Sequence, residues 1–273
     1  MAERIDYEAE YDNRAKVPDH PAVMAGWAEE SARYRATHPP VTLAYGRGAR
    51  ERIDLFEAAE AGPIVMFIHG GYWQALDGTS FSHMAKGLNA HGISVAVPTY
   101  DLCPQVSVAQ IIDQMRAAAM RLHGLFGQRV VAIGHSAGGH LAACLLATDW
   151  KAIDADLPAD LVVAAFSISG IFDLPPLLKT PLNRALNLDR VEALRLSPMF
   201  WPAPRGRRFK AAVGALEGIE YERQSREIVA RWRAGGADAE YQRIADANHF
   251  TIIAPLADAG SEMVAQLAKM LPR

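Results

Sequence analysis

The sequence predicts an α/β fold with a mostly parallel sheet of eight strands and helices on both faces. Short runs of strand-forming residues alternate with longer segments of helical periodicity along most of the 273 residues. Most of these short runs are continuously apolar, as expected for strands that helices cover on both faces. Because right-handed crossovers join strand, helix and strand in turn, most of the strands should run parallel.

The first forty residues precede this alternation. They are polar with scattered aromatics and end in THPP, so we expect residues 1–40 to form a helical arm that packs on the main body. Residues 41–46 and 52–58 are predicted to form an opening hairpin around GRGAR. The remaining strands are expected at 64–68, 93–98, 129–134, 161–169, 209–214 and 239–244, and the main helices at 80–90, 108–126, 137–148, 221–236 and 254–271.

One segment interrupts the alternation. Residues 170–204 are proline-rich and contain only short helical pieces. An insertion at this point would lie over the carboxyl ends of the strands, where ligands bind in open α/β sheets. We therefore expect a single domain, residues 1–273, with a cap or lid at 170–204.

Composition excludes several classes of function. Charged residues make up 22% of the chain and the net charge is −3, so the basic field that nucleic-acid binding requires is missing. The basic run RGRRFK, residues 205–210, is interpreted as a solvated loop before a strand. Cys103 and Cys144 lack the spacing of zinc ligands, so we expect no metal and no cofactor. The polar N-terminus and the absence of a long apolar run predict a cytoplasmic protein without a membrane partner.

The stretch GHSAG, residues 134–138, fits the G-x-S-x-G pattern of a nucleophilic serine. A predicted strand precedes it and a predicted helix follows it, which is the context that this sharp turn requires. Small residues at Gly134 and Gly138 would let strand and helix approach closely and hold out the hydroxyl of Ser136. The alternatives are a glycine-rich turn without chemistry or a phosphate cradle, although neither common phosphate-loop pattern is matched.

A serine hydroxyl needs a base to take its proton, and His249 is the candidate. This histidine follows the strand predicted at 239–244 and precedes the final helix, as the chain order serine, acid, histidine requires. His135 and His140 flank the serine itself, and the other histidines lie in arm, helix or loop positions where a structural role is usual.

The acid should follow the strand at 209–214, where the sequence reads GALEGIEYERQS. Glu217 stands where this loop turns, and its carboxylate would accept a hydrogen bond from the imidazole and stabilise the imidazolium. Glu220 is the alternative acid, but Glu220 and Glu222 are expected to begin the next helix, where negative charge suits the helix dipole. Asp246 lies near the histidine in sequence but on the wrong loop.

The apolar run IVMFI ends abruptly in HGGYW, residues 69–73, and this loop is the candidate oxyanion hole. Backbone N–H groups in a dry pocket stabilise the negative charge of a tetrahedral intermediate. The amide of Ala137, directly after the nucleophile, is one expected donor. The amides of Gly71 and Tyr72 are the others.

The aromatic residues of this loop indicate a flat or aromatic substrate. We expect Gly70, Trp73 and Phe172 to contact that substrate, with Tyr72 as a further wall, and core packing is the alternative for the aromatic rings of the loop. Asp173 either meets an amine of the substrate or caps a helix that begins at the following prolines.

Eight sequence motifs together resemble the kynurenine formamidase (arylformamidase) branch of the α/β-hydrolase superfamily. They are HGGYW, GHSAGGHLAA, SGIFDLPPLL, NHF, YDNRAKVPD, YDLCP, LATDW and YERQS, spread over nearly the whole chain. The resemblance implies an α/β-hydrolase fold, with Ser136 as nucleophile, His249 as base and the HGGYW loop as oxyanion hole. Glu217 departs from the pattern, because the family usually has aspartate at this position.

The resemblance also implies hydrolysis of an N-formyl aryl amine, with N-formyl-L-kynurenine as reference substrate and formate as a product. The residues alone indicate acyl transfer from Ser136 to water on a substrate with an aromatic part. Aryl esters, other small amides and carbamates are the alternative substrates, and a non-catalytic binding protein is the alternative function. The expected partner is a small aromatic molecule, and a homodimer is compatible with the sequence.

Overall fold

The computed structural model describes residues 5–58 and 62–272, and the strands in these ranges form one sheet. The strands are β1 (Val41–Ala44), β2 (Arg52–Phe56), β3 (Ile64–Ile68), β4 (Ser94–Thr99), β5 (Val130–His135), β6 (Val162–Ile168), β7 (Arg208–Gly214) and β8 (Asp238–Ile244). Their order in the eight-stranded sheet is β1-β2-β4-β3-β5-β6-β7-β8. Strand β2 runs antiparallel to both of its neighbours, and every other neighbouring pair is parallel. The predicted α/β class is confirmed.

The helices follow the predicted alternation with the strands. The α-helices are α1 (Tyr7–Tyr11), α2 (Asn13–Lys16), α3 (His20–Thr37), α4 (Lys86–Asn89), α5 (Val108–Phe126), α6 (Ala137–Leu146), α7 (Trp150–Ile153), α8 (Asn183–Leu186), α9 (Arg190–Arg195), α10 (Ile219–Ala234) and α11 (Glu262–Met270). The 3₁₀ helices are η1 (Gly78–Ala85), η2 (Pro175–Lys179), η3 (Pro198–Phe200) and η4 (Thr251–Ala257).

Two predicted helices are each divided in the structure. The segment at 80–90 is η1 followed by α4, and the segment at 254–271 is η4 followed by α11. Proline explains the second division, because Pro255 lies inside η4 and cannot donate the hydrogen bond that a continuous α-helix needs. A separate helix then begins after Ser261, whose hydroxyl accepts from the amide of Val264.

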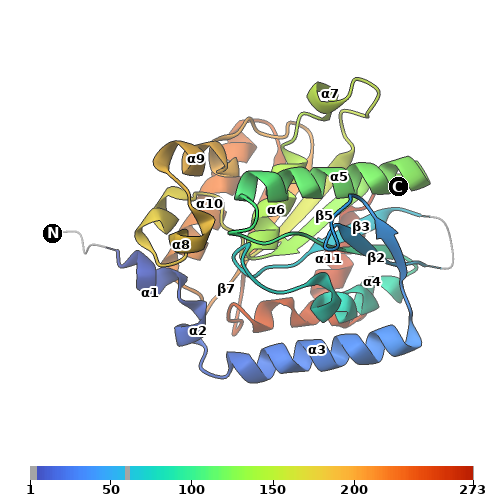
Figure 1. Ribbon diagram of the computed structural model, residues 1–273, viewed down its shortest axis with the longest axis horizontal. Helices are drawn as coiled ribbons and strands as arrows, with labels where there is room; N and C mark the ends of the chain where they lie inside the picture. Colours follow the sequence, from blue (N-terminus) through green and yellow to red (C-terminus); the bar gives the residue numbers. More distant parts are fainter. Residues whose placement is uncertain (1–4, 59–61, 273) are drawn as a thin grey trace.

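Helices cover the sheet on both faces (Figure 1). Strand β3 shows why, because Ile64, Met66 and Ile68 face one apolar layer, whereas Val65 and Phe67 face the other. The first layer is closed by α5, α6 and α10, and the second by α3, α4 and α11. Both faces of this strand are therefore buried, as its continuous apolar sequence predicts.

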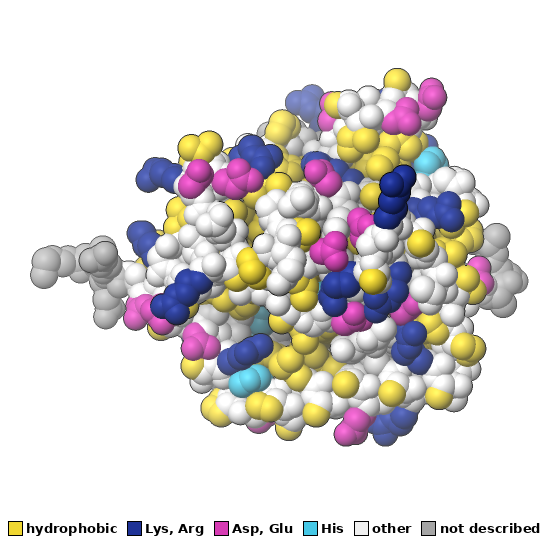
Figure 2. Space-filling view, in the orientation of Figure 1, with side chains coloured by type: hydrophobic (Ala, Val, Ile, Leu, Met, Phe, Trp, Pro, Cys, Tyr) yellow, Lys and Arg dark blue, Asp and Glu magenta, His cyan; other side chains and the backbone are white. Residues whose placement is uncertain are grey.

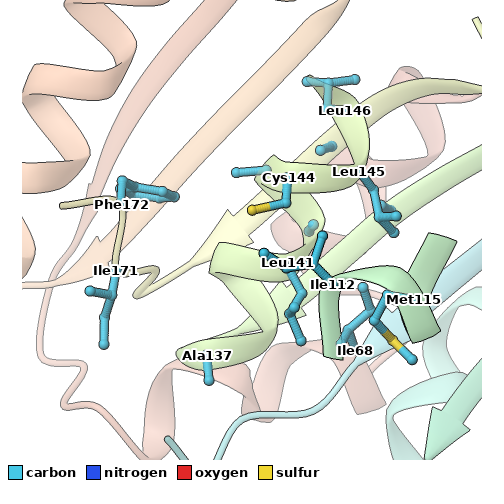
Figure 3. Close-up of a cluster of buried hydrophobic side chains, with 14 of the residues drawn as sticks. Ile68, Ile112, Met115, Ala137, Leu141, Cys144, Leu145, Leu146, Ile171 and Phe172 are labelled. Carbon is cyan, nitrogen blue, oxygen red and sulfur yellow. The ribbon is translucent and has the colours of Figure 1, made fainter. Parts of the chain in front are cut away.

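The close-up in Figure 3 shows the first layer next to the carboxyl end of β3. Ile68, the last residue of that strand, lies beside Ile112 and Met115 of α5 and Leu141 of α6. All four side chains are buried, so the end of β3 rests on a packed apolar base.

Two segments outside the sheet lie next to each other. The N-terminal helices α1 and α2 lie beside the insertion that contains η2, α8 and α9 (Figure 1), and α1 contacts η2. On the face shown in Figure 2, charges of both signs are interspersed with hydrophobic side chains. Within residues 5–58 and 62–272, no helix is long and apolar enough to cross a membrane.

Candidate active site

Ser136 occupies a strained turn between β5 and α6. Its backbone has φ 57° and ψ −119°, a conformation that a non-glycine residue adopts only when the surrounding structure holds it. Glycine is required on either side of the turn. A Cβ at Gly134 would collide with the carbonyl of Gly138, and a Cβ at Gly138 would collide with the carbonyl of Ile68. The local sequence thus folds as the elbow that G-x-S-x-G predicts.

The structure brings the three predicted polar residues together in one hydrogen-bonded chain. Oγ of Ser136 lies 3.0 Å from Nε2 of His249, and Nδ1 of His249 lies 2.6 Å from Oε2 of Glu217. The other two members of this chain are shielded from water, with exposed side-chain fractions of 8% for His249 and 1% for Glu217. If Nδ1 donates to the carboxylate, Nε2 is left free to accept the serine proton.

Glu217 is held by two further donors. Its Oε1 accepts from the hydroxyl of Ser169 and from the amide of Gly214, both at 2.6 Å. A carboxylate held at both oxygens cannot rotate away from the imidazole. The role of Ser169 was not predicted: it begins the motif SGIFDLPPLL, but nothing in that motif indicates that its hydroxyl reaches the acid.

The alternative acids are engaged elsewhere or lie apart from the serine. Oε2 of Glu220 accepts from the hydroxyl of Tyr11 at 3.1 Å, and Arg223 binds its other oxygen at 2.7 Å. Glu222 pairs with Arg226 at 2.8 Å in the first turn of α10. Both residues therefore begin a helix, as the sequence predicts.

The HGGYW loop lies directly against the serine. A Cβ at Gly70 would be only 3.0 Å from Cβ of Ser136, so glycine is needed for this close approach. In the described turns and loops, no acceptor is recorded for the backbone amides of Gly71, Tyr72 and Ala137. Three N–H groups beside the nucleophile without a protein partner can receive a developing oxyanion.

A cavity of about 450 Å³ opens above the serine. Its floor contains Ser136 and His249 together with Gly70 of the loop. Aromatic side chains form much of its wall, and the insertion and the N-terminal arm close its outer side. The aromatic lining is Tyr11, Trp27, Tyr72, Phe81 and Phe250, the insertion adds Thr180, Pro181 and Leu182, and the arm adds Glu8, Asp12, Asn13 and Arg14.

Two predicted substrate contacts are wrong. Trp73 and Phe172 are both 0% exposed, belong to the apolar core and do not line the cavity. The backbone of Trp73 has φ 58°, which turns the indole inward until it meets the ring of His140 at 5.0 Å. The ring of Phe172 packs edge-on against Phe209 at 6.0 Å. Gly70 lines the cavity, and its contact with the substrate stays a prediction.

Neither interpretation of Asp173 matches the structure. Its carboxylate pairs with Arg223 at 2.9 Å, and the helix η2 starts after Leu174 without a side-chain cap. Asp173 therefore anchors the insertion to α10 and is absent from the cavity lining.

The N-terminal arm contributes site residues that sequence reasoning missed. Nδ2 of Asn13 donates to the hydroxyl oxygens of Tyr72 at 2.9 Å and Tyr221 at 2.8 Å. The motif YDNRAKVPD contains this asparagine. However, nothing in the motif indicates that the arm folds back over the carboxyl ends of the strands.

Burial sets the protonation of the groups around the serine. It lowers the pKa of His135 well below its usual value, and the neighbouring His249 lowers it further. It also raises the pKa of Tyr72 well above its usual value, mainly through loss of water. Both side chains are therefore neutral near pH 7 and act only as hydrogen-bonding groups.

Known proteins are similar to this chain in sequence and fold. The BD-FAE family model matches residues 54–178. Kynurenine formamidases of Danio rerio and Salmo salar are 28% and 29% identical to the chain, over 86% and 85% of its length and 83% and 81% of theirs. A crystal structure of a Silicibacter protein, provisionally described as a thioesterase, is 31% identical with a TM-score of 0.85. That match covers 96% of this chain and 98% of the other.

Proposed function

The chain belongs to the kynurenine formamidase-like branch of the α/β-hydrolase superfamily, and on this premise we propose that it hydrolyses N-formyl aryl amines such as N-formyl-L-kynurenine. The products are the free aryl amine and formate. The observation that carries the proposal is the hydrogen-bonded chain from Ser136 through His249 to Glu217 at the floor of an aromatic cavity.

Formation of a formyl enzyme is the first half of the reaction. Oγ of Ser136 attacks the formyl carbon while Nε2 of His249 takes the hydroxyl proton. The carbonyl oxygen becomes an oxyanion, which the amides of Gly71, Tyr72 and Ala137 stabilise. When the C–N bond breaks, the imidazolium returns its proton to the leaving nitrogen, and the aryl amine departs. Glu217 stabilises the imidazolium throughout.

Water completes the reaction. His249 removes a proton from a water molecule, which attacks the formyl ester on Ser136. The second tetrahedral intermediate uses the same amides and then collapses to formate, and the serine regains its proton from the imidazolium. No cofactor or metal enters either half of the reaction.

The lining of the cavity supports an aromatic amino acid as the substrate. Trp27 and Phe250 offer apolar ring surface for an aryl ring. At the mouth, Arg14 lies near Glu8 and Asp12, so both charge signs are present for the carboxylate and ammonium of an amino acid.

The test is a comparison of kcat/KM for N-formyl-L-kynurenine and p-nitrophenyl acetate, with Ser136→Ala as the blank. We expect the formamide to be cleaved faster, and the variant to lose at least about a thousandfold in kcat with both substrates. If kcat/KM is higher for the ester than for the formamide, the carboxylesterase alternative replaces the proposal. A wild-type protein that cleaves neither substrate and whose Ser136 resists a fluorophosphonate probe would be a binding protein.

Further expectations accompany this function. We propose the cytoplasm as the compartment, supported by Cys103 and Cys144, which are buried and unpaired thiols. A homodimer, and the absence of nucleic-acid and membrane partners, stay predictions.

A further inference from the structure

The candidate oxyanion loop has a strained backbone. Tyr72 and Trp73 have φ of 51° and 58°, so two consecutive residues with large side chains are in the left-handed region. Gly71 before them has φ 108°. Such a run persists only where neighbouring groups hold it, so the contacts of these side chains determine where the Tyr72 amide points.

Trp73 is held by the core, but Tyr72 is held by its hydroxyl. The amide of Cys103 donates to the carbonyl of Trp73 at 2.8 Å, and the indole is fully buried. The Tyr72 side chain instead reaches the N-terminal arm, where its hydroxyl donates to the carbonyl of Tyr11 at 2.7 Å. The same hydroxyl oxygen accepts from Nδ2 of Asn13 at 2.9 Å.

The direction of each hydrogen bond in this cluster follows from counting protons. The hydroxyl proton of Tyr72 goes to the Tyr11 carbonyl, which can only accept. Tyr221 must therefore donate in its 2.6 Å contact with Tyr72. The Tyr72 oxygen thus accepts from Tyr221, and Asn13 gives it a further N–H at 2.9 Å. The second N–H of Asn13 goes to the Tyr221 oxygen at 2.8 Å. Asn13 is the group that satisfies both tyrosines at once.

The cluster also borders the base. The ring of Tyr221 lies 4.9 Å from the ring of His249. The arm is fastened here by a second contact, because the hydroxyl of Tyr11 donates to Oε2 of Glu220 at 3.1 Å. Asn13 itself is 5% exposed, so its amide is fixed between the arm, the loop and α10.

We infer that Asn13 is a positioning residue for the reaction, which aims the Tyr72 amide at the oxyanion by holding the hydroxyls of Tyr72 and Tyr221. The inference rests on the proposed oxyanion role of that amide and not on the identity of the substrate. Asn13 acts through the tyrosines, so its effect belongs to the transition state and not to substrate binding.

The experiment compares Asn13→Leu, Tyr72→Phe and the double variant. Leucine keeps the size of the asparagine side chain and removes both N–H donors, and phenylalanine removes only the hydroxyl. Steady-state kinetics on N-formyl-L-kynurenine and p-nitrophenyl acetate give kcat and KM, and a fluorophosphonate probe gives the rate of Ser136 labelling. The labelling rate reports on the oxyanion hole even if the formamide is not a substrate, because the P=O oxygen takes the place of the carbonyl oxygen.

We expect each single variant to lose on the order of 10- to 100-fold in kcat and in labelling rate, with KM changed by less than about threefold. The kcat of the double variant should be at most about threefold lower than that of either single variant, because both substitutions remove the same contact. The matched control is Tyr34→Phe, which loses a 2.6 Å bond from a tyrosine hydroxyl of α3 to Asn89, away from the cavity. Its melting temperature should fall as much as that of Tyr72→Phe, without loss of kcat.

Three outcomes would overturn the inference. In the first, the kcat and labelling rate of Asn13→Leu stay within twofold of wild type. In the second, the losses in kcat of the two single variants multiply in the double variant. In the third, the variants change KM alone. If Asn13→Leu fails to fold, the comparison of Tyr72→Phe with Tyr34→Phe decides, because equal kcat values would contradict the inference. If wild type does not cleave the formamide and the variants are labelled at the wild-type rate, both proposals are refuted. If wild type does not cleave the formamide but the variants are labelled more slowly, only the proposed substrate is refuted.

Discussion

Nε2 of His135 lies 2.8 Å from the carbonyl oxygen of His249, and the two imidazole rings are 4.8 Å apart. Because burial keeps His135 neutral, the proton on Nε2 is donated to that carbonyl. The residue directly before the nucleophile thus holds the backbone of the base. The distance between Ser136 and His249 depends on this bond as well as on Glu217.

The first prediction concerns this bond. Replacing His135 with phenylalanine keeps a ring but removes the donor, so the loop that carries His249 should shift and kcat/KM should fall about tenfold. His135→Gln retains an N–H group and should recover most of the loss. Steady-state kinetics on p-nitrophenyl acetate measure both variants. Equal losses in the two variants would mean that the contact has no role in placing the base.

The second prediction concerns the length of the acid. Glu217→Asp shortens the side chain by one methylene, so the carboxylate cannot reach His249 and also keep the amide of Gly214 and the hydroxyl of Ser169. We expect kcat to fall about tenfold in this variant and by roughly a thousandfold or more in Glu217→Gln, which removes the charge. KM should stay within about threefold for both. A Glu217→Asp variant as fast as wild type would show that the extra methylene carries no geometric requirement.

The third prediction concerns stability in acid. Burial lowers the pKa of His69, His83 and His140 from 6.5 to about 4, and that of His135 also falls well below 6.5. The unfolded chain therefore binds these protons more readily than the folded chain. Their contribution to the free energy of unfolding is complete above pH 6.5 and is lost as pH falls towards 4, by about 1.4 kcal/mol per proton per pH unit.

Urea denaturation between pH 7.5 and 5 measures this loss. Replacing the buried His140 with glutamine should reduce the proton uptake on unfolding by about one near pH 5. The control is His91→Gln, since His91 lies on the surface. Equal proton uptake by the two variants would contradict the assignment.

The fourth prediction concerns the mouth of the cavity. Arg14 is exposed on α2 and lines the cavity, and no ion pair of this side chain is recorded within residues 5–58 and 62–272. If its guanidinium receives the carboxylate of N-formyl-L-kynurenine, Arg14→Met should raise KM for that substrate about tenfold. KM for formanilide, which has no carboxylate, should not change.

Arg47→Met is the matched control for this variant. Arg47 is exposed in the loop between β1 and β2 and does not line the cavity. Its replacement removes the same charge and should leave both KM values as they are in wild type. If Arg14→Met raises KM equally for both substrates, the guanidinium does not recognise a carboxylate.

The parts of the site that sequence predicts are those tied to a local pattern. Ser136 is defined by glycines two residues away on each side, and His249 and Glu217 by the strands that they follow. In each case backbone topology places the side chain, because parallel strands end at one edge of the sheet. For the same reason, the predicted strands agree with those of the structure within about two residues at each end.

The remaining parts depend on backbone angles and on long-range packing. An aromatic after two glycines can face the cavity or the core, and the positive φ that sends Trp73 into the core cannot be read from its type. Asn13 is remote in sequence from every residue that it contacts in the loop and in α10. No periodicity or spacing indicates which hydroxyl an arm residue will meet.

The cavity walls have a consequence for how such a protein changes its substrate. The bond-breaking groups directly follow strands of the sheet, whereas the outer wall comes from the arm and from the segment around Thr180, Pro181 and Leu182, neither of which belongs to the sheet. Exposed positions of these two segments can be exchanged without disturbing the apolar layers that stabilise the fold. Apart from the buried Asn13, reactivity and selectivity are thus encoded in separate stretches of the chain. Mutant libraries restricted to those exposed positions should therefore yield new substrate ranges on an unaltered catalyst.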